Sequence, residues 1–151
     1  MQLVLRDATL TEVTEAGLIA ELDAELQRRY PEEFINGIDA ARFATEGGYM
    51  AVALADGQHA GCGALSPVDT TTVELKRMYV RPAFRGNGVA RQLLQHLEAE
   101  AGRRGFTHMV LETGVRQPEA QALYRSVGYT TIAPFGPYGN SARRVYLGKS
   151  L

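Results

Sequence analysis

Residues 85–90, which read Arg-Gly-Asn-Gly-Val-Ala, combine a cation, two glycines and the start of a helix. The first N–H groups of a helix have no partner within it and lie at the positive end of its dipole. Gly86 and Gly88 have no β-carbon, so an anion can approach these N–H groups closely. The segment therefore predicts a site for a pyrophosphate, with Arg85 adding charge. The alternative is that both glycines serve only the geometry of the turn.

The flanking elements suit such a site. Residues 72–80 read as a strand of β-branched, aromatic and long side chains, which ends before Pro82 because proline cannot donate to a strand ladder. Apolar residues then recur at helical spacing over residues 88–104. No third glycine stands in register for a dinucleotide fingerprint, and no Lys-Ser/Thr pair follows Gly88 as in a P-loop. The bound anion therefore belongs to another kind of ligand.

Two ordered motifs carry a resemblance to a known family. Residues 85–90 match the pattern Arg/Gln-x-x-Gly-x-Gly/Ala, and a second group follows at the usual distance: Leu111-Glu112-Thr113, Ala120, Leu123-Tyr124 and Gly128-Tyr129. In both, the chain resembles the GNAT superfamily of acyl-CoA-dependent N-acyltransferases. The resemblance spans residues 73–130, about half of the chain.

The resemblance implies an acetyl-CoA site. In that family the fourth and fifth strands splay apart, and the pantetheine arm lies between them as a pseudo-strand. Here the arm would pair with Met78, Tyr79 and Val80, and the pyrophosphate would lie on Arg85, Gly86, Asn87, Gly88, Val89 and Ala90. Gln117 stands where many members carry an asparagine that contacts the arm.

Three side chains are candidates for proton transfer. Tyr124 occupies the tyrosine position of the family's Ala-x-x-Leu-Tyr pattern, where a phenol can protonate the departing thiolate; otherwise it packs on the sheet. Glu112 and Glu74 each stand where some members carry a base, and partial burial would raise the pKa of either carboxyl. Either could instead form a salt bridge, or the amine could lose its proton to solvent. The resemblance favours Glu112 of the two, because its spacing from Tyr124 is the closer match to family members that use this strand.

Composition narrows the function class. The 151 residues, of which 45% are hydrophobic, suit one N-acetyltransferase domain over residues 1–151. A net charge of −1 without a long basic block argues against nucleic acid. The absence of a long apolar run or a signal-peptide pattern predicts a cytoplasmic protein without membrane contact. No cluster has metal-ligand spacing, and Cys62 between two glycines reads as a buried, inert thiol.

The order of elements predicts the fold class. Strands are expected at residues 3–6, 49–55, 59–66, 72–80, 107–113, 129–133 and 144–147, and helices at residues 11–29, 40–44, 88–104 and 118–128. The order β-α-α-β-β-β-α-β-α-β-β indicates one α/β domain with a mixed sheet flanked by helices, the order that the GNAT resemblance also implies.

The sequence defines the acceptor substrate and its pocket less closely than the acetyl-CoA site. The resemblance assigns its pocket to residues 27–43 and 134–140, a polar set comprising Arg28, Arg29, Tyr30, Glu32, Glu33, Phe34, Arg42, Tyr138 and Asn140. This set suits a small primary amine, and arginines could hold the carboxylate of an amino acid. A peptide or protein amine remains an alternative, as does a non-catalytic acyl-CoA-binding sensor or accessory domain. A homodimer is also left open.

Overall fold

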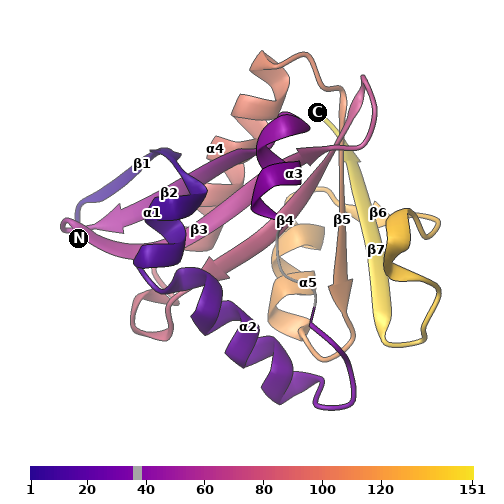
Figure 1. The fold of residues 1–151 in the computed structure, drawn as a ribbon, viewed down its shortest axis with the longest axis horizontal. Helices are drawn as coiled ribbons and strands as arrows, with labels where there is room; N and C mark the ends of the chain where they lie inside the picture. Colours follow the sequence, from indigo (N-terminus) through magenta and orange to yellow (C-terminus); the bar gives the residue numbers. More distant parts are fainter. Residues whose placement is uncertain (36–38) are drawn as a thin grey trace.

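A seven-stranded sheet organises the computed structural model, which describes residues 1–35 and 39–151. Its strands are β1 (Leu3–Ala8), β2 (Tyr49–Ala55), β3 (Gln58–Pro67), β4 (Thr72–Val80), β5 (His108–Gly114), β6 (Thr130–Thr131) and β7 (Arg144–Ser150). They lie in the order β1-β2-β3-β4-β5-β7-β6 (Figure 1). Only β4 and β5 pair in parallel among the described strands, as the helical crossover between them requires.

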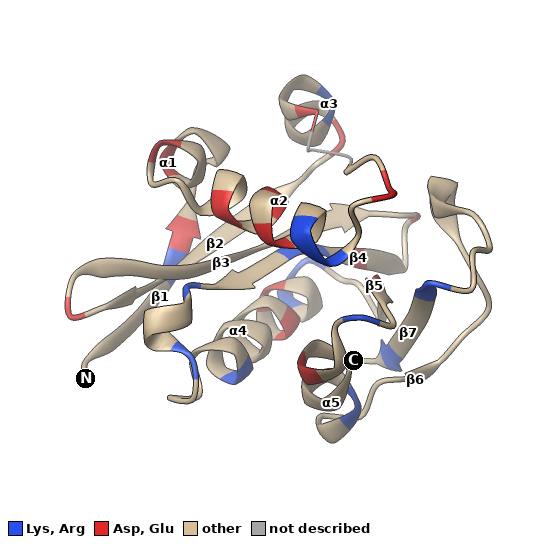
Figure 2. Ribbon diagram, turned by 90° about the horizontal axis from the view of Figure 1, so that it is seen from below, with Lys and Arg blue, Asp and Glu red and all other residues tan. Residues whose placement is uncertain are grey.

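Helices cover both faces of the sheet. They are α1 (Leu10–Glu15), α2 (Leu18–Arg29), α3 (Ala40–Thr45), α4 (Val89–Arg103) and α5 (Pro118–Ser126). Figure 2 shows α1, α2 and α3 on one face and α4 and α5 on the other. The largest core cluster includes Leu93 and Leu97 of α4 with Met109 and Leu111 of β5, all nearly fully buried. None of the helices in the described chain is long and apolar enough to cross a membrane.

The predicted fold class is confirmed, with a correction near the N-terminus. The helix expected over residues 11–29 is two helices, α1 and α2, because Gly17 adopts a left-handed conformation (φ 85°) between them. The apolar stripe nevertheless faces the core as expected, since Val13, Leu18 and Leu22 are buried. The strand expected over residues 129–133 shortens to β6, which leaves the buried Tyr129 in the core beside α5.

The strands β4 and β5 separate along their length. Their register in the described chain starts with Thr72 opposite His108 and stops with Glu74 opposite Val110. Both strands continue beyond this point, to Val80 and Gly114 respectively, and Figure 1 shows them diverging. Backbone groups on this side of β4 therefore remain available to another extended chain.

Cys62 is a packing residue, as the sequence predicted. It is fully buried in β3, and its thiol donates to the carbonyl of Arg77 at 3.4 Å. Burial raises the pKa of this thiol to about 12, so the reactive thiolate is scarce at neutral pH.

Candidate active site

The turn before α4 has the open geometry of an anion site. Gly86 and Gly88 both have positive φ, 81° and 78°, a conformation that few other residues adopt without strain. Gly88 is the N-cap of α4, and no side chain satisfies the first N–H groups of the helix there. A β-carbon added at either glycine would meet no atom within 4 Å. No described residue therefore crowds either glycine, which leaves room for an anion to approach the turn.

Arg85 is held beside this turn by protein partners. Its Nε donates to the carbonyl of Val80 at 2.8 Å, and its Nη2 donates to Oε1 of Glu25, on α2, at 2.9 Å. Asn87 is exposed, and its amide donates within the turn itself, to the carbonyls of Phe84 and Arg85. An anion bound at this turn would therefore lie beside an arginine that already forms an ion pair with Glu25.

The expected cofactor residues line one cavity of about 340 Å³. Of the residues that the sequence assigned to acetyl-CoA, all but Asn87 contribute to this wall: Met78, Tyr79, Val80, Arg85, Gly86, Gly88, Val89, Ala90 and Gln117. The cavity thus runs from the splayed part of β4 to the turn at the start of α4. Its length and lining suit an extended ligand that ends in an anion.

A second cavity, of about 230 Å³, holds the two candidate bases. Glu74, Glu112 and Tyr138 line it, and it shares part of its wall with the first cavity. The shared residues are Leu22, Met78, Gln117, Ala120 and Tyr124. Tyr124 therefore contacts both spaces, which is the position that a group acting between two substrates must occupy.

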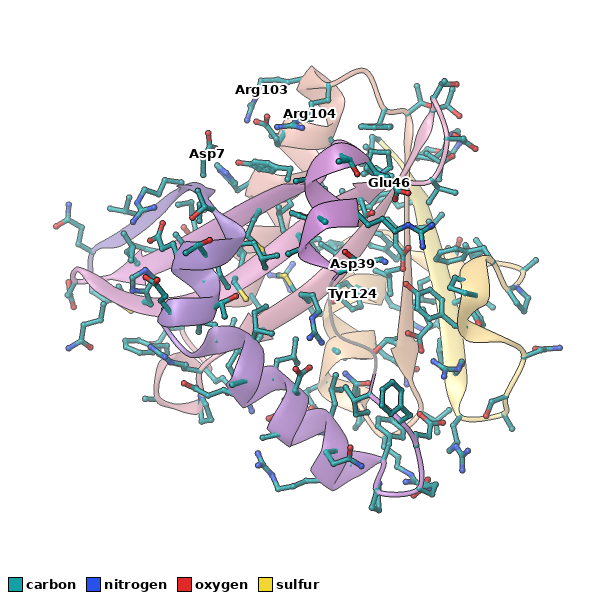
Figure 3. The ribbon with its side chains drawn as sticks, viewed as in Figure 1. Asp7, Asp39, Glu46, Arg103, Arg104 and Tyr124 are labelled. Atoms are coloured by element: carbon teal, nitrogen blue, oxygen red, sulfur yellow. The ribbon has the colours of Figure 1, made fainter. Side chains whose placement is uncertain are left out.

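The Tyr124 hydroxyl has no hydrogen-bond partner among residues 1–35 and 39–151. The side chain is only 6% exposed, and Figure 3 shows it near the centre of the molecule, far from Arg103 and Arg104 at the outer end of α4. Its ring packs edge-on against Tyr129, with the centroids 5.7 Å apart. Burial raises the pKa of the Tyr124 phenol above its ordinary value, with no hydrogen bond to a described residue to offset it. The phenol therefore keeps its proton at neutral pH.

Glu74 is a buried carboxylate with a neutral hydrogen-bond donor. The Tyr138 hydroxyl donates to its Oε2 at 2.5 Å, and Nζ of Lys76 lies 3.8 Å from its Oε1. Burial raises the pKa of Glu74, while Tyr138 and Lys76 partly oppose that shift. A carboxyl in such surroundings can both accept and hold a proton nearer to neutral pH.

Glu112 differs because it is neutralised by a permanent cation. Nη1 of Arg144 donates to its Oε1 at 3.1 Å, and both side chains are 20% exposed. Burial again raises the pKa of Glu112, while the Arg144 guanidinium opposes that shift. The two carboxylates thus lie on one cavity with different partners, and Glu74 lacks the tight arginine pair that Glu112 has.

Gln117 lies where the sequence placed it, immediately before α5 as its N-cap residue. Its Oε1 accepts a hydrogen bond from the Tyr30 hydroxyl at 3.4 Å, and that hydroxyl also accepts the backbone N–H of Arg116 at 3.0 Å. A β-carbon on Gly114 would overlap Tyr30, so this glycine permits the contact between α2 and the end of β5. The amide of Gln117 is thereby fixed at the wall between the two cavities.

The acceptor segments contribute only in part. Tyr30, Glu33, Phe34 and Tyr138 line the second cavity, whereas Arg28, Arg29, Glu32, Arg42 and Asn140 do not. Arg29 instead lines the first cavity and pairs with Glu119. Arg42 lies on α3 and forms an ion pair with Glu46, the C-cap of that helix. Residues 36–38 of the expected segment lie outside the described residues.

Four cationic side chains that the sequence analysis did not assign to the site also line the second cavity. They are Lys76, Arg77, Arg143 and Arg144. Arg143 joins β7 to the segment after α2, because its guanidinium donates to Glu33 at 2.8 Å and to Glu32 at 3.2 Å. The pair Arg143-Arg144 is visible in the sequence, but its position beside β5 depends on the pairing of strands far apart in the chain.

Comparisons with known proteins agree with this geometry. Residues 15–129 match the model of the acetyltransferase (GNAT) family. The IAA acetyltransferase of Azospirillum brasilense is 40% identical over 136 residues, which are 89% of this chain and 88% of that protein. A solved structure from Klebsiella pneumoniae, assigned to the acyl-CoA N-acyltransferases, has a TM-score of 0.87 at 30% identity and covers 99% of this chain and 98% of its own. A PaiA N-acetyltransferase from Thermoplasma acidophilum, solved with coenzyme A, has the same fold with a TM-score of 0.75 at 14% identity, over 100% of both chains.

Proposed function

The chain belongs to the GNAT family of acetyltransferases, and we propose that it moves an acetyl group from acetyl-CoA directly to the primary amine of a small molecule or an amino acid. The observation that carries the proposal is that Tyr124 lines both cavities at once, while its hydroxyl has no hydrogen-bond partner among the described residues. The first cavity would take acetyl-CoA and the second the amine. The coenzyme A bound to the Thermoplasma relative supports the first of these assignments.

Acetyl-CoA would be bound mainly by the backbone. The pantetheine arm would lie in the gap where β4 has left β5, hydrogen-bonded to the free side of Met78 to Val80. The pyrophosphate would lie on the N–H groups after Gly86 and Gly88. Gln117, fixed by Tyr30, would contact the arm from the opposite wall.

The chemistry needs three proton transfers. Glu74 would take a proton from the bound ammonium group, directly or through water, and the free amine would attack the thioester carbonyl. The new N–C bond forms, the C–S bond breaks, and the second amine proton passes to water as the amide forms. Tyr124 would give its phenolic proton to the departing thiolate and regain a proton from solvent. Glu112 would serve mainly to hold Arg144 in the cavity wall.

Direct assay with acetyl-CoA tests the proposal. The protein should release free CoA in the presence of a pool of small amines and amino acids, and mass spectrometry should find acceptors that are heavier by one acetyl group. Binding of acetyl-CoA without any acylated product would favour the sensor or accessory alternative. Acylation confined to peptides would favour a peptide or protein N-acetyltransferase. A cytoplasmic location and a single domain over residues 1–151 are further predictions, which this assay does not test.

Substitution at the turn tests the cofactor site. Acetyl-CoA at about 100 times its Kd should stabilise the protein by about 2.7 kcal/mol and raise its Tm by roughly 5–10 °C, with ATP and NAD much less effective. Gly88→Asp should remove this shift, because a carboxylate would repel the pyrophosphate while Asp tolerates the positive φ better than most residues.

Gly57→Asp is the matched control for this substitution. Gly57 has φ 82° in the hairpin between β2 and β3, open space around it, and no part in either cavity. Its variant should keep the full Tm shift with acetyl-CoA. Equal stabilisation by ATP, or a Gly88→Asp variant that responds like the wild type, would refute the cofactor assignment.

A further inference from the structure

Arg77 has an unusual backbone for a residue in a strand. Apart from Asp56 in the hairpin turn, it is the only non-glycine residue in the described chain with a positive φ, at 56°. It lies at an irregularity of β4, where the register against β3 shifts between Cys62 and Ala64. A strained backbone conformation of this kind persists only where the surrounding contacts hold it in place, and such residues are common at functional sites. The irregularity turns the Arg77 side chain toward α2 and the second cavity.

The guanidinium of Arg77 is buried but poorly satisfied. The side chain is 8% exposed and lines the second cavity. Nη2 lies 2.7 Å from Oδ1 of Asp23 on α2, yet neither Nε nor Nη2 has a hydrogen-bond partner among the described residues. Arg143 donates to Glu33 and Arg144 donates through Nη1 to Glu112, although Nε of Arg144 is likewise buried without a partner among the described residues. Nη1 of Arg77 also has no hydrogen bond to a described residue, and it is not among the buried atoms. It is therefore the donor of Arg77 that a ligand in the cavity can reach.

We infer that Arg77 binds a carboxylate of the acceptor, so that the preferred acceptors are amines that also carry a carboxylate, such as amino acids. This inference rests on the proposed function and names the acceptor class of that same site. A guanidinium matches a carboxylate in charge, and Nη1 of Arg77 can donate a charge-assisted hydrogen bond to one of its oxygens. Glu74 and Arg77 stand three residues apart on β4 and line the same cavity, so one molecule can present its ammonium group to the first and its carboxylate to the second.

Neighbouring charges determine how strongly Arg77 can discriminate. Asp23 contacts the guanidinium from α2, and the nearest cation along β4, Lys76, is directed to Glu74 at 3.8 Å. An acceptor that lacks a carboxylate would cover Nη1 of Arg77 without accepting its hydrogen bond. Sites that lose such a hydrogen bond reject the analogue more strongly than sites that lose only apolar contact.

The experiment compares amino acids with their carboxamides as acceptors, at saturating acetyl-CoA. The series includes α-, β- and γ-amino acids, because the spacing between amine and carboxylate is part of the measurement. The wild type should acetylate at least one amino acid with a kcat/KM about tenfold or more above that of its amide. Arg77→Gly should abolish this preference by raising KM for the amino acid about tenfold or more, with little change for the amide. Glycine accepts the positive φ, so the variant should stay folded and keep its response to acetyl-CoA, although loss of the buried side chain and its ion pair with Asp23 should lower its Tm.

Asp23→Asn is the matched control, because it removes the ion pair and leaves the guanidinium in the cavity. If Arg77 binds the acceptor, this variant keeps the preference, and its KM for the amino acid is no higher than in the wild type. If the ion pair is merely structural, Asp23→Asn and Arg77→Gly impair both kinds of acceptor alike, and the inference is overturned.

The remaining outcomes separate the inference from the proposed function. Transfer to amines with no preference for a carboxylate overturns the inference alone. If no amine is acetylated, the proposed function fails, and binding then decides the inference: calorimetry on the protein loaded with CoA measures the Kd of N-acetyl amino acids and of their amides. Tighter binding of the acids in the wild type, lost in Arg77→Gly, would still support a carboxylate site. Equal or undetectable binding would overturn it.

Discussion

Replacing Tyr124 with phenylalanine should lower kcat by about 100-fold or more while the Kd for CoA stays close to that of the wild type. The substitution keeps the ring that packs against Tyr129 and removes only the hydroxyl of a residue that lines both cavities. General acid catalysis by a positioned side chain contributes about 10²–10⁴-fold to a rate, so loss of the only proton donor proposed here should be of that order. Steady-state kinetics with calorimetry for CoA would measure both quantities.

Tyr129→Phe is the matched control for Tyr124→Phe. Its phenol is also buried, but it donates to Glu98 at 2.8 Å and lines neither cavity. This variant should lose stability through a broken buried hydrogen bond, by about 1 kcal/mol, and should keep its turnover. If Tyr124→Phe turns over as fast as the wild type, Tyr124 is a packing residue and the thiolate leaves by another route.

The lining of the first cavity, which we propose for acetyl-CoA, could be predicted because its determinants are local. The glycines at 86 and 88, the helix after them and the strand before them are adjacent in sequence, and their φ angles and capping follow from residue type. Tyr124 could be placed because a helix fixes its spacing from Gln117, the N-cap. The break at Gly17 was missed because a single glycine within an apolar periodic segment is also compatible with one continuous helix.

The acceptor half could not be predicted in the same way. Tyr138 lies 64 residues from Glu74, and Arg144 lies 32 residues from Glu112, so each carboxylate receives its partner only when β7 pairs with β5. Arg77 reaches the cavity through an irregularity in β4, and sequence patterns with a period of two cannot indicate such an irregularity. The sequence therefore names both carboxylates as candidates, but only their surroundings distinguish them.

Those surroundings lead us to expect that Glu74→Gln, and not Glu112→Gln, removes the base. Glutamine nearly matches the shape of glutamate and can still accept the Tyr138 hydrogen bond, but it cannot take a proton. We expect kcat/KM of Glu74→Gln to fall by about 100-fold or more. In the wild type, kcat/KM should decline as the pH falls through the pKa of Glu74, because the protonated carboxyl is no base. Burial raises that pKa above 4.5, so the decline begins at a higher pH than for an exposed glutamate.

The pH profile and the melting temperature test this assignment together. Glu74→Gln should lose the acidic decline, whereas Glu112→Gln should keep it and change mainly stability or the acceptor KM, since it frees Arg144 from its carboxylate. The folded-state pKa of Glu74 lies above its unfolded value, so this group costs the wild type stability as the pH rises past both values. Glu74→Gln should therefore melt no lower than the wild type at neutral pH, even though it turns over slowly.

The opposite pattern would reverse the assignment: an acidic decline of kcat/KM that survives in Glu74→Gln and disappears in Glu112→Gln. If both variants keep it with near-wild-type turnover, the amine must arrive already deprotonated, because no other carboxylate lines the cavity in the described chain except Glu33, which is tied to Arg143.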